Sequence, residues 1–125
     1  MKTIQSKYLG GFTLVEIMIV VAIIGLLAVI ALPNLVRARA TSQANACINN
    51  LRQIEAAVQQ IAIAKNLADG DTVAYPSDVS PYIKLNANGS IPPCPAGGTY
   101  SLLLVGQSPQ SQCSLSTLTP AHALK

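Results

Sequence analysis

The chain has 125 residues, with eight Lys and Arg against five Asp and Glu, and charged residues make up only 10% of it. This length allows one small domain plus a membrane segment. The formal net charge of +3 depends on Lys2 and Lys7 at the extreme N-terminus, because six basic and five acidic side chains remain without them. No cluster of Lys or Arg is left that could neutralise several phosphates, so the composition argues against a nucleic-acid-binding protein.

Residues 12–32 form an apolar run in which Glu16 is the only charged side chain. The other residues are apolar apart from Thr13 and the small Gly25. A helix rises about 1.5 Å per residue, so the run is long enough to cross the roughly 30 Å hydrocarbon core of a bilayer. A lone carboxylate in that setting costs about 2.5–3.5 kcal/mol, and such residues are rare unless they have a partner. The run therefore predicts a membrane helix in which Glu16 has a specific role.

The residues around the start of this run form a motif, Lys7-Tyr8-Leu9-Gly10-Gly11-Phe12-Thr13-Leu14-Val15-Glu16. This motif resembles the processing site of the type IV pilin family, which includes the pseudopilins of type II secretion systems. The likeness continues to Gly25 and Pro33, which fall where that family often breaks its helix.

The resemblance implies how the N-terminal segment is used. A membrane peptidase would cut after Gly11, and the new N-terminal residue, Phe12, would be N-methylated. The Glu16 carboxylate of one subunit would meet the Phe12 amine of a neighbour and so set the axial register of a filament. Gly25 and Pro33 would let the helix loosen when it leaves the bilayer.

Two other interpretations of the N-terminus stay open. An ordinary secretory signal peptide would be cut near Ala38-Arg39-Ala40 and leave Thr41 as the first residue, although its apolar region usually spans only about 7–15 residues. A plain transmembrane anchor would explain the apolar run but neither Gly10-Gly11 nor Glu16.

Residues 12–66 are predicted to form one long helix, with a kink or local loosening near 28–33. Pro33 is the cause, because proline lacks an amide donor and clashes with the preceding turn. Beyond Pro33 the apolar residues recur every three or four positions and form one stripe, which a C-terminal segment would cover. The stripe consists of Ile48, Leu51, Ile54, Val58 and Ile61. Asn66 and Asp69-Gly70-Asp71 predict the end of the helix.

The remainder of the chain is rich in turn residues. A helical turn is expected at 81–84 and two short strands at 99–105 and 113–118, with 106–112 as a hairpin loop. The expected fold class is α+β, with a long N-terminal helix and a minimal antiparallel sheet laid on its amphipathic half.

The expected domain organisation has three parts. Residues 1–11 are a leader peptide, 12–36 a transmembrane and assembly helix, and 37–125 a pilin-like domain outside the cytoplasm.

Three cysteines are present: Cys47, Cys94 and Cys113. Disulfides persist outside the cytoplasm, and the expected pair is Cys94–Cys113, because both residues lie in the same loop-rich tail. A ring of this size contributes about 3 kcal/mol by chain entropy. Cys47 is then the odd thiol, either a small buried hydrophobe or a residue with an interface or pairing role. The string Cys94-Pro95-Ala96-Gly97-Gly98-Thr99-Tyr100 also resembles short pilin-like proteins whose tail is closed by a disulfide.

The sequence offers no set of catalytic residues. The single histidine, His122, is expected in a solvated C-terminal tail, so neither a nucleophile pair nor a transition-metal cluster is predicted, and no cofactor is expected. Asp69, Asp71 and Asp78 are a candidate calcium site by likeness to some pseudopilins. Their spacing is not that of an EF-hand, and a solvated turn is the simpler interpretation.

These observations predict a non-enzymatic structural subunit of a type IV pilus or a type II secretion pseudopilus. The resemblance implies that its partners are other pilin-like subunits, prepilin peptidase and the inner-membrane assembly machinery. It also implies a single-pass protein of the bacterial inner membrane that later enters a filament. The orientation rests on the resemblance, because two basic residues lie on each side of the apolar run. The alternative is a membrane-tethered binding module that does not polymerise.

Overall fold

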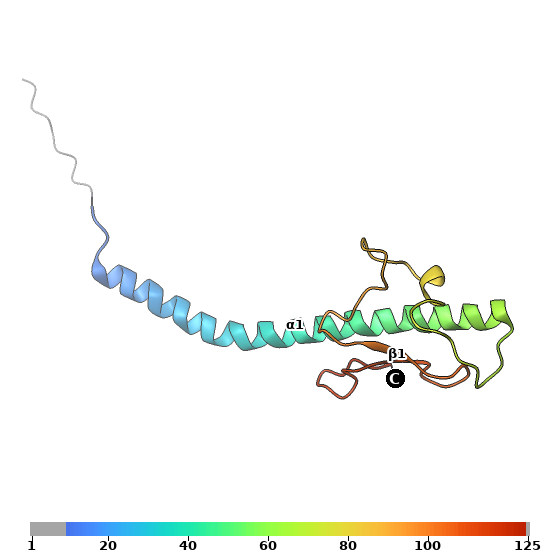
Figure 1. Ribbon diagram of the computed structural model, residues 1–125. Coiled ribbons are helices and arrows are strands. Elements are labelled where there is room, and N and C mark those ends of the chain that lie inside the picture. The colour runs from blue at the N-terminus through green and yellow to red at the C-terminus, as the bar shows by residue number, and fades with distance from the viewer. Residues whose placement is uncertain (1–9, 125) are drawn as a thin grey trace, which may run out of the picture. The chain divides into compact units, whose positions relative to one another are not determined.

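The structure is a computed structural model that describes residues 10–124. The expected leader, residues 1–11, lies outside the described residues except for Gly10 and Gly11. The elements in chain order are helix α1 (Leu14–Lys65), the short 3-10 helix η1 (Ser80–Tyr82), and strands β1 (Tyr100–Leu102) and β2 (Ser111–Cys113), shown in Figure 1. The expected α+β class, with one long helix and a minimal antiparallel sheet, is confirmed.

Two compact units divide the chain between Val36 and Arg37, and α1 contributes to both. In the first unit, nearly all the apolar side chains of α1 are exposed. This part of the helix is long and apolar enough to cross a membrane, judged by length and composition alone. Pro33 lies inside α1, whose 52 residues form a single helix through that position.

The C-terminal end of α1 is closed by a Schellman motif. Asn66 has a positive φ of 50°, and its amide donates to the carbonyl of Ile63 at 3.3 Å, while the amide of Leu67 donates to Ala62 at 2.9 Å. These bonds satisfy carbonyls that the last helical turn would otherwise leave free. The prediction that the helix ends at Asn66 is therefore confirmed.

The core of the second unit lies on the amphipathic half of α1. Leu51, Ile54 and Ile61 are fully buried, and Ile48 is the one member of the predicted stripe that is only half-buried. Loop and strand residues cover this face, among them Val73, Val79, Ile91, Tyr100 and Val105. The stripe therefore packs against the C-terminal segment, as its periodicity predicts.

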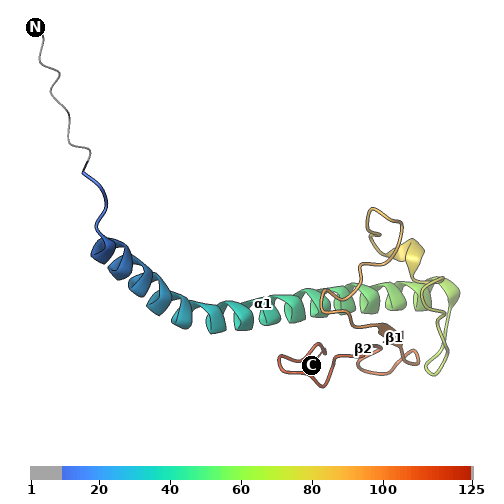
Figure 2. The ribbon, with the colours of Figure 1, turned by 60° about the vertical axis from the view of Figure 1, so that its left-hand side comes forward.

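Strands β1 and β2 form a two-stranded antiparallel sheet that lies along the C-terminal half of α1 (Figure 1, Figure 2). Tyr100 pairs with Cys113, and Leu102 pairs with Ser111. Two polar contacts attach β2 and the residue before it to the helix. The amide of Gln110 donates to Glu55 Oε1 at 3.0 Å, and Ser111 Oγ donates to the Leu51 carbonyl at 3.3 Å.

The predicted strand boundaries were wrong, and the backbone hydrogen bonds give the reason. The expected strand 99–105 ends early because Val105 pairs with the loop after α1, donating to Asp71 and accepting from Gly70, both at 2.9 Å. The expected strand 113–118 is a turn beyond Cys113, where the amide of Ser116 donates to the Cys113 carbonyl at 3.0 Å. Pairing instead begins upstream, at Ser111.

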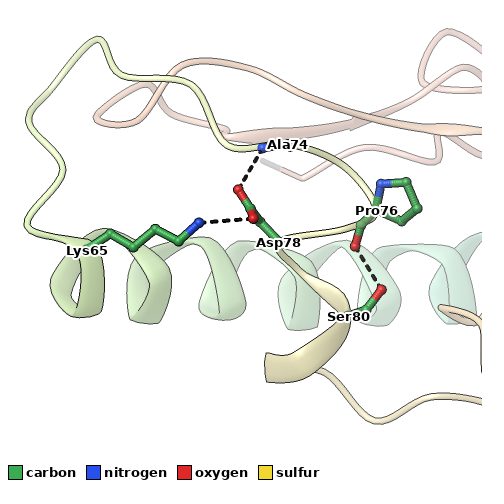
Figure 3. Close-up of polar contacts among 5 residues, drawn as sticks. All are labelled: Lys65, Ala74, Pro76, Asp78 and Ser80. Carbon is green, nitrogen blue, oxygen red and sulfur yellow. Dashed lines mark hydrogen bonds and ion pairs between the residues drawn. The ribbon is translucent and has the colours of Figure 1, made fainter.

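A polar contact fixes the loop between α1 and η1 (Figure 3). Lys65 Nζ lies 2.9 Å from Asp78 Oδ1, and the other oxygen of Asp78 accepts the amide of Ala74 at 3.2 Å. Ser80 Oγ donates to the Pro76 carbonyl at 2.8 Å. The last turn of α1 is therefore joined to the residues that lead into η1.

We expect Leu51→Ala to destabilise the second unit by about 2–5 kcal/mol, because it removes a fully buried side chain and leaves a cavity. Ile63→Ala on the same helix is the matched control, since Ile63 is 78% exposed and its loss should cost little. Chemical denaturation of the full chain in mild detergent measures both variants. Equal losses of stability would contradict the placement of the core.

The contact between Lys65 and Asp78 should make stability depend on pH. The hydrogen bond from Lys65, followed by that from the Ala74 amide, lowers the pKa of Asp78. A carboxyl whose pKa is depressed by folding stabilises the fold above its unfolded pKa of about 3.9, and this contribution is lost as the pH falls through the folded pKa.

Asp78→Asn should therefore be less stable than the native chain at neutral pH, and the difference should shrink as the pH falls below about 4. Both side chains of the pair are partly exposed, so the effect should be small. Asp78→Asn in a Lys65→Met background is the control and should have less effect. A difference that does not change with pH would contradict the ion pair.

Candidate functional site

The start of α1 is closed by a capping box between Thr13 and Glu16. The amide and Oγ1 of Thr13 both donate to Glu16 Oε2, at 2.8 and 2.7 Å, and the amide of Glu16 donates to Thr13 Oγ1 at 3.3 Å. Reciprocal bonds of this kind satisfy donors that the first turn of a helix leaves free. The Thr-x-x-Glu spacing is the sequence signal for this arrangement, which sequence reasoning missed by treating Glu16 only as a misplaced charge.

The glycines of the N-terminal motif are not required by packing in the described fold. A Cβ atom added at Gly10, Gly11 or Gly25 would meet nothing within 4 Å. Phe12 is 84% exposed. Gly10 and Gly11 precede the helix, and a larger side chain would fit at either position without a steric clash.

A second group of side chains comes together in the core of the second unit. Cys47, Cys94, Cys113 and His122 are all buried, and one ligand atom from each lies within 4.8 Å of the others. Cys94 Sγ lies 3.4 Å from His122 Nδ1. The three thiols are free in the structure, so a Cys94–Cys113 disulfide stays a prediction.

The expectation that His122 lies in a solvated tail was wrong, because its side chain is only 4% exposed. After β2 the chain turns, and the amide of His122 donates to the Leu115 carbonyl at 3.4 Å. This turn returns the histidine ring to the sulfur atoms.

Four separate segments supply the members of this cluster: the middle of α1, the loop before β1, the end of β2 and the C-terminal tail. Asn50 and Gln43, on α1 near Cys47, hold the loop, since Asn50 Nδ2 donates to the carbonyls of Pro92 and Pro93 at 3.3 and 3.4 Å. Gln43 Nε2 donates to the Pro95 carbonyl at 3.4 Å. Cys94 is thereby held against the helix.

Two glycines shape the loop beside Cys94. Gly97 has a positive φ of 84°, and its amide donates to the Cys94 carbonyl at 2.9 Å. At Gly98 an added Cβ would lie 2.6 Å from Cys113 Sγ, so only glycine leaves room for that sulfur. The string from Cys94 to Tyr100, which resembles a disulfide-closed tail in the sequence, therefore supplies one member of the cluster and the space for another.

The surroundings affect two of the thiols in opposite ways. Burial, with a smaller effect from the Cys94 thiol, raises the pKa of Cys47 to about 12. Burial also acts against ionisation of Cys94, but hydrogen bonds from the backbone of Ala96 and Gly98 and from the thiols of Cys47 and Cys113 together lower the pKa of that thiol.

The three aspartates of the candidate calcium site have local roles. Asp71 Oδ2 accepts the Ala68 amide at 2.8 Å, and Asp78 is paired with Lys65. The side chain of Asp69 packs over Gly106, where an added Cβ would lie 2.5 Å from its Oδ1 atom. A calcium ion at these residues would have to compete with these contacts.

Comparison with known proteins identifies the N-terminal segment. Residues 8–32 match the family described as the prokaryotic N-terminal methylation motif. The type IV major pilin protein PilA of Myxococcus xanthus is 52% identical over 44 residues, which are 35% of this chain and 20% of PilA. A type IV major fimbrial protein FimA of Dichelobacter nodosus is 37% identical over 87 residues, which are 59% of this chain and 53% of FimA.

The chain spans about a fifth of that PilA and about half of that FimA. No solved structure matches it significantly. The chain therefore carries a prepilin-type N-terminal methylation motif on a long apolar helix and is similar to type IV pilins, which confirms the resemblance seen in the sequence.

Proposed function

We propose that the chain is a non-enzymatic subunit of a type IV pilus or a type II secretion pseudopilus, processed between Gly11 and Phe12 and polymerised through residues 12–36. One observation carries the proposal: a prepilin methylation motif at residues 8–32 leads into a helix whose apolar surface is exposed. The partners would be other pilin-like subunits, prepilin peptidase and the inner-membrane assembly machinery.

The exposed apolar surface of α1 has to be shielded from water. Its side chains between Leu14 and Val36 include many large aliphatic residues, most of them at least half exposed. Contiguous apolar surface of this kind marks contact with a membrane or with another protein. The bilayer covers it before assembly, and the same segments of other subunits cover it within a filament, where one contact is repeated without closing.

The Glu16 carboxylate has one oxygen available for a neighbour. Both donors of Thr13 go to Oε2, and Oε1 takes no part in the capping box. Cleavage after Gly11 frees a positively charged amine at Phe12. Opposite charges attract strongly in a low-dielectric medium, and each is costly there without the other. Oε1 can therefore accept the Phe12 amine of another subunit while Oε2 still caps its own helix.

Gly25 and Pro33 would ease the transfer of the segment from lipid to filament. Pro33 removes one hydrogen bond of the helix, and Gly25 favours backbone freedom. A Cβ at Gly25 would meet nothing within 4 Å, so packing within the described fold gives no reason for a glycine there. The helix between these residues could stretch without breaking side-chain contacts of the second unit.

The helical state of residues 38–41 argues against an ordinary signal peptidase. These residues lie inside α1, where Thr41 Oγ1 donates to the Arg37 carbonyl at 3.0 Å. A cut before Thr41 would also divide α1 itself and separate its apolar part from the second unit. The sequence around Gly10-Gly11 lies instead before the helix begins.

We predict that the mature N-terminus is N-methylated Phe12. Intact mass and N-terminal sequencing of membrane-extracted protein test this, and a host that lacks prepilin peptidase is the control, in which residues 1–11 should be retained. A mature N-terminus at Thr41, or a retained leader in the presence of an active peptidase, would overturn the assignment.

We predict that Glu16→Ala inserts into the membrane and is cleaved normally but enters filaments poorly, because it loses the charge that the Phe12 amine needs. Glu16→Asp should be partly active, since it keeps the charge with a shorter reach. Filament yield after shearing, relative to membrane-extracted subunit, measures both variants.

Thr13→Ala is the matched control, because it removes the cap, at about 0.5–2 kcal/mol, but keeps the carboxylate. It should assemble far better than Glu16→Ala. If both variants fail equally, helix capping rather than charge pairing is what assembly requires. If the native chain does not polymerise when its assembly machinery is present, the alternative of a membrane-tethered binding module is favoured.

A further inference from the structure

We propose that Cys47, Cys94, Cys113 and His122 bind one Zn²⁺ ion in a closed, four-coordinate structural site. The four side chains are between 0% and 4% exposed, and their ligand atoms lie within 4.8 Å of one another. Three thiolates and one imidazole are a ligand set that Zn²⁺ takes in structural sites.

The spacing of the ligand atoms fits a tetrahedral ion. With Zn–S bonds of about 2.3 Å and a Zn–N bond of about 2.0–2.1 Å, sulfur atoms lie about 3.8 Å apart and a sulfur and a nitrogen about 3.5 Å apart. The distance from Cys94 Sγ to His122 Nδ1 is 3.4 Å. The largest separation in the group, at most 4.8 Å, needs a contraction of about 1 Å, which side-chain rotation can supply.

A disulfide explains less of this arrangement. A bond between Cys94 and Cys113 would use two of the four groups and leave Cys47 and His122 buried beside it. A buried imidazole needs hydrogen-bond partners, and a disulfide sulfur accepts only weakly. A bound zinc ion uses all four groups together.

The surroundings of Cys94 and Cys113 also suit a metal site. The Gly97 amide donates to the Cys94 carbonyl at 2.9 Å and so fixes the loop at Cys94, and Gly98 leaves space for the sulfur of Cys113. Three thiolates and Zn²⁺ together carry one negative charge, which costs less to bury than separate ions do. Binding requires no redox partner: the three thiols release their protons to solvent as the Zn–S bonds form.

A metal ion would supply what this small unit otherwise lacks. The sheet has only three residues in each strand, and the four ligands come from α1, the loop before β1, β2 and the tail. One ion would tie all four segments together. Small domains commonly rely on a metal or on disulfides for this purpose.

The first test is the metal content of the full chain, extracted from membranes in mild detergent without chelator or reductant. We expect about one zinc per chain by mass spectrometry of the metal. We also expect the thiols to resist alkylation until a chelator is added. A chain without metal overturns the proposal, whether its thiols are free or become reactive only after reduction of a Cys94–Cys113 disulfide.

The second test changes one ligand. His122→Ala should lower Zn²⁺ affinity by more than the roughly 10–100-fold that loss of a supporting residue costs. His122→Cys should restore binding, and its Co²⁺-loaded form should show a stronger thiolate-to-metal charge-transfer band than the native chain.

Val79→Ala is the control for instability in the second test, because Val79 is fully buried but outside the cluster. It should lose stability and keep its zinc. Native affinity in His122→Ala, or unchanged Co²⁺ spectra in His122→Cys, would overturn the assignment of His122 as a ligand.

The third test leaves every ligand in place. Gly98→Ala places a methyl group against Cys113 Sγ and should weaken Zn²⁺ binding about 10–100-fold. Gly89→Ala is the control for instability, because the positive φ of Gly89, 71°, strains an alanine there, while an added Cβ would meet nothing within 4 Å. Equal zinc affinity in the two variants would contradict the close approach of Gly98 to the site.

Discussion

The fold of the second unit depends on one apolar face of α1, because the tail cannot form a core without it. The two strands have three residues each, and a two-stranded sheet is at best marginally stable in water. The fully buried side chains of Leu51, Ile54 and Ile61 supply the surface on which loops and strands pack. The hydrophobic stabilisation of the tail therefore depends on residues outside it.

The same helix serves two environments, and its sequence changes character between them. The side chains before Val36 are apolar on all sides and almost all exposed, whereas those after Arg37 are apolar on one face, which is covered. In the proposed function lipid or other subunits cover the first part, and the chain itself covers the second. A single element thus links the proposed filament contacts to the small domain.

Polar contacts from α1 decide where the tail lies on that face. Asn50 holds the carbonyls of Pro92 and Pro93 and donates to the hydroxyl of Tyr100 at 3.1 Å, while Glu55 accepts the amide of Gln110. These contacts place Cys94 and Cys113 beside Cys47. The match to the methylation motif ends at residue 32, so this cluster is a property of the chain beyond the motif.

The sequence by itself determined the features that depend on local pattern. The apolar run predicted a membrane helix, and the Gly-Phe motif carried the resemblance to type IV pilins. The stripe from Ile48 to Ile61 predicted the packed face of the helix. Helical periodicity and composition are local properties, so the sequence alone reveals them. Asn66 likewise predicted the helix end, since it tolerates the positive φ that the Schellman motif requires.

Only the tertiary structure decided the features that depend on pairing between distant residues. The limits of the strands were set by Val105, which pairs with the loop after α1 rather than with β2. The approach of His122 to the three cysteines follows from the turn after β2 and from the position of the tail on α1. No short spacing in the sequence reveals this cluster, because its four members are brought together by folding alone.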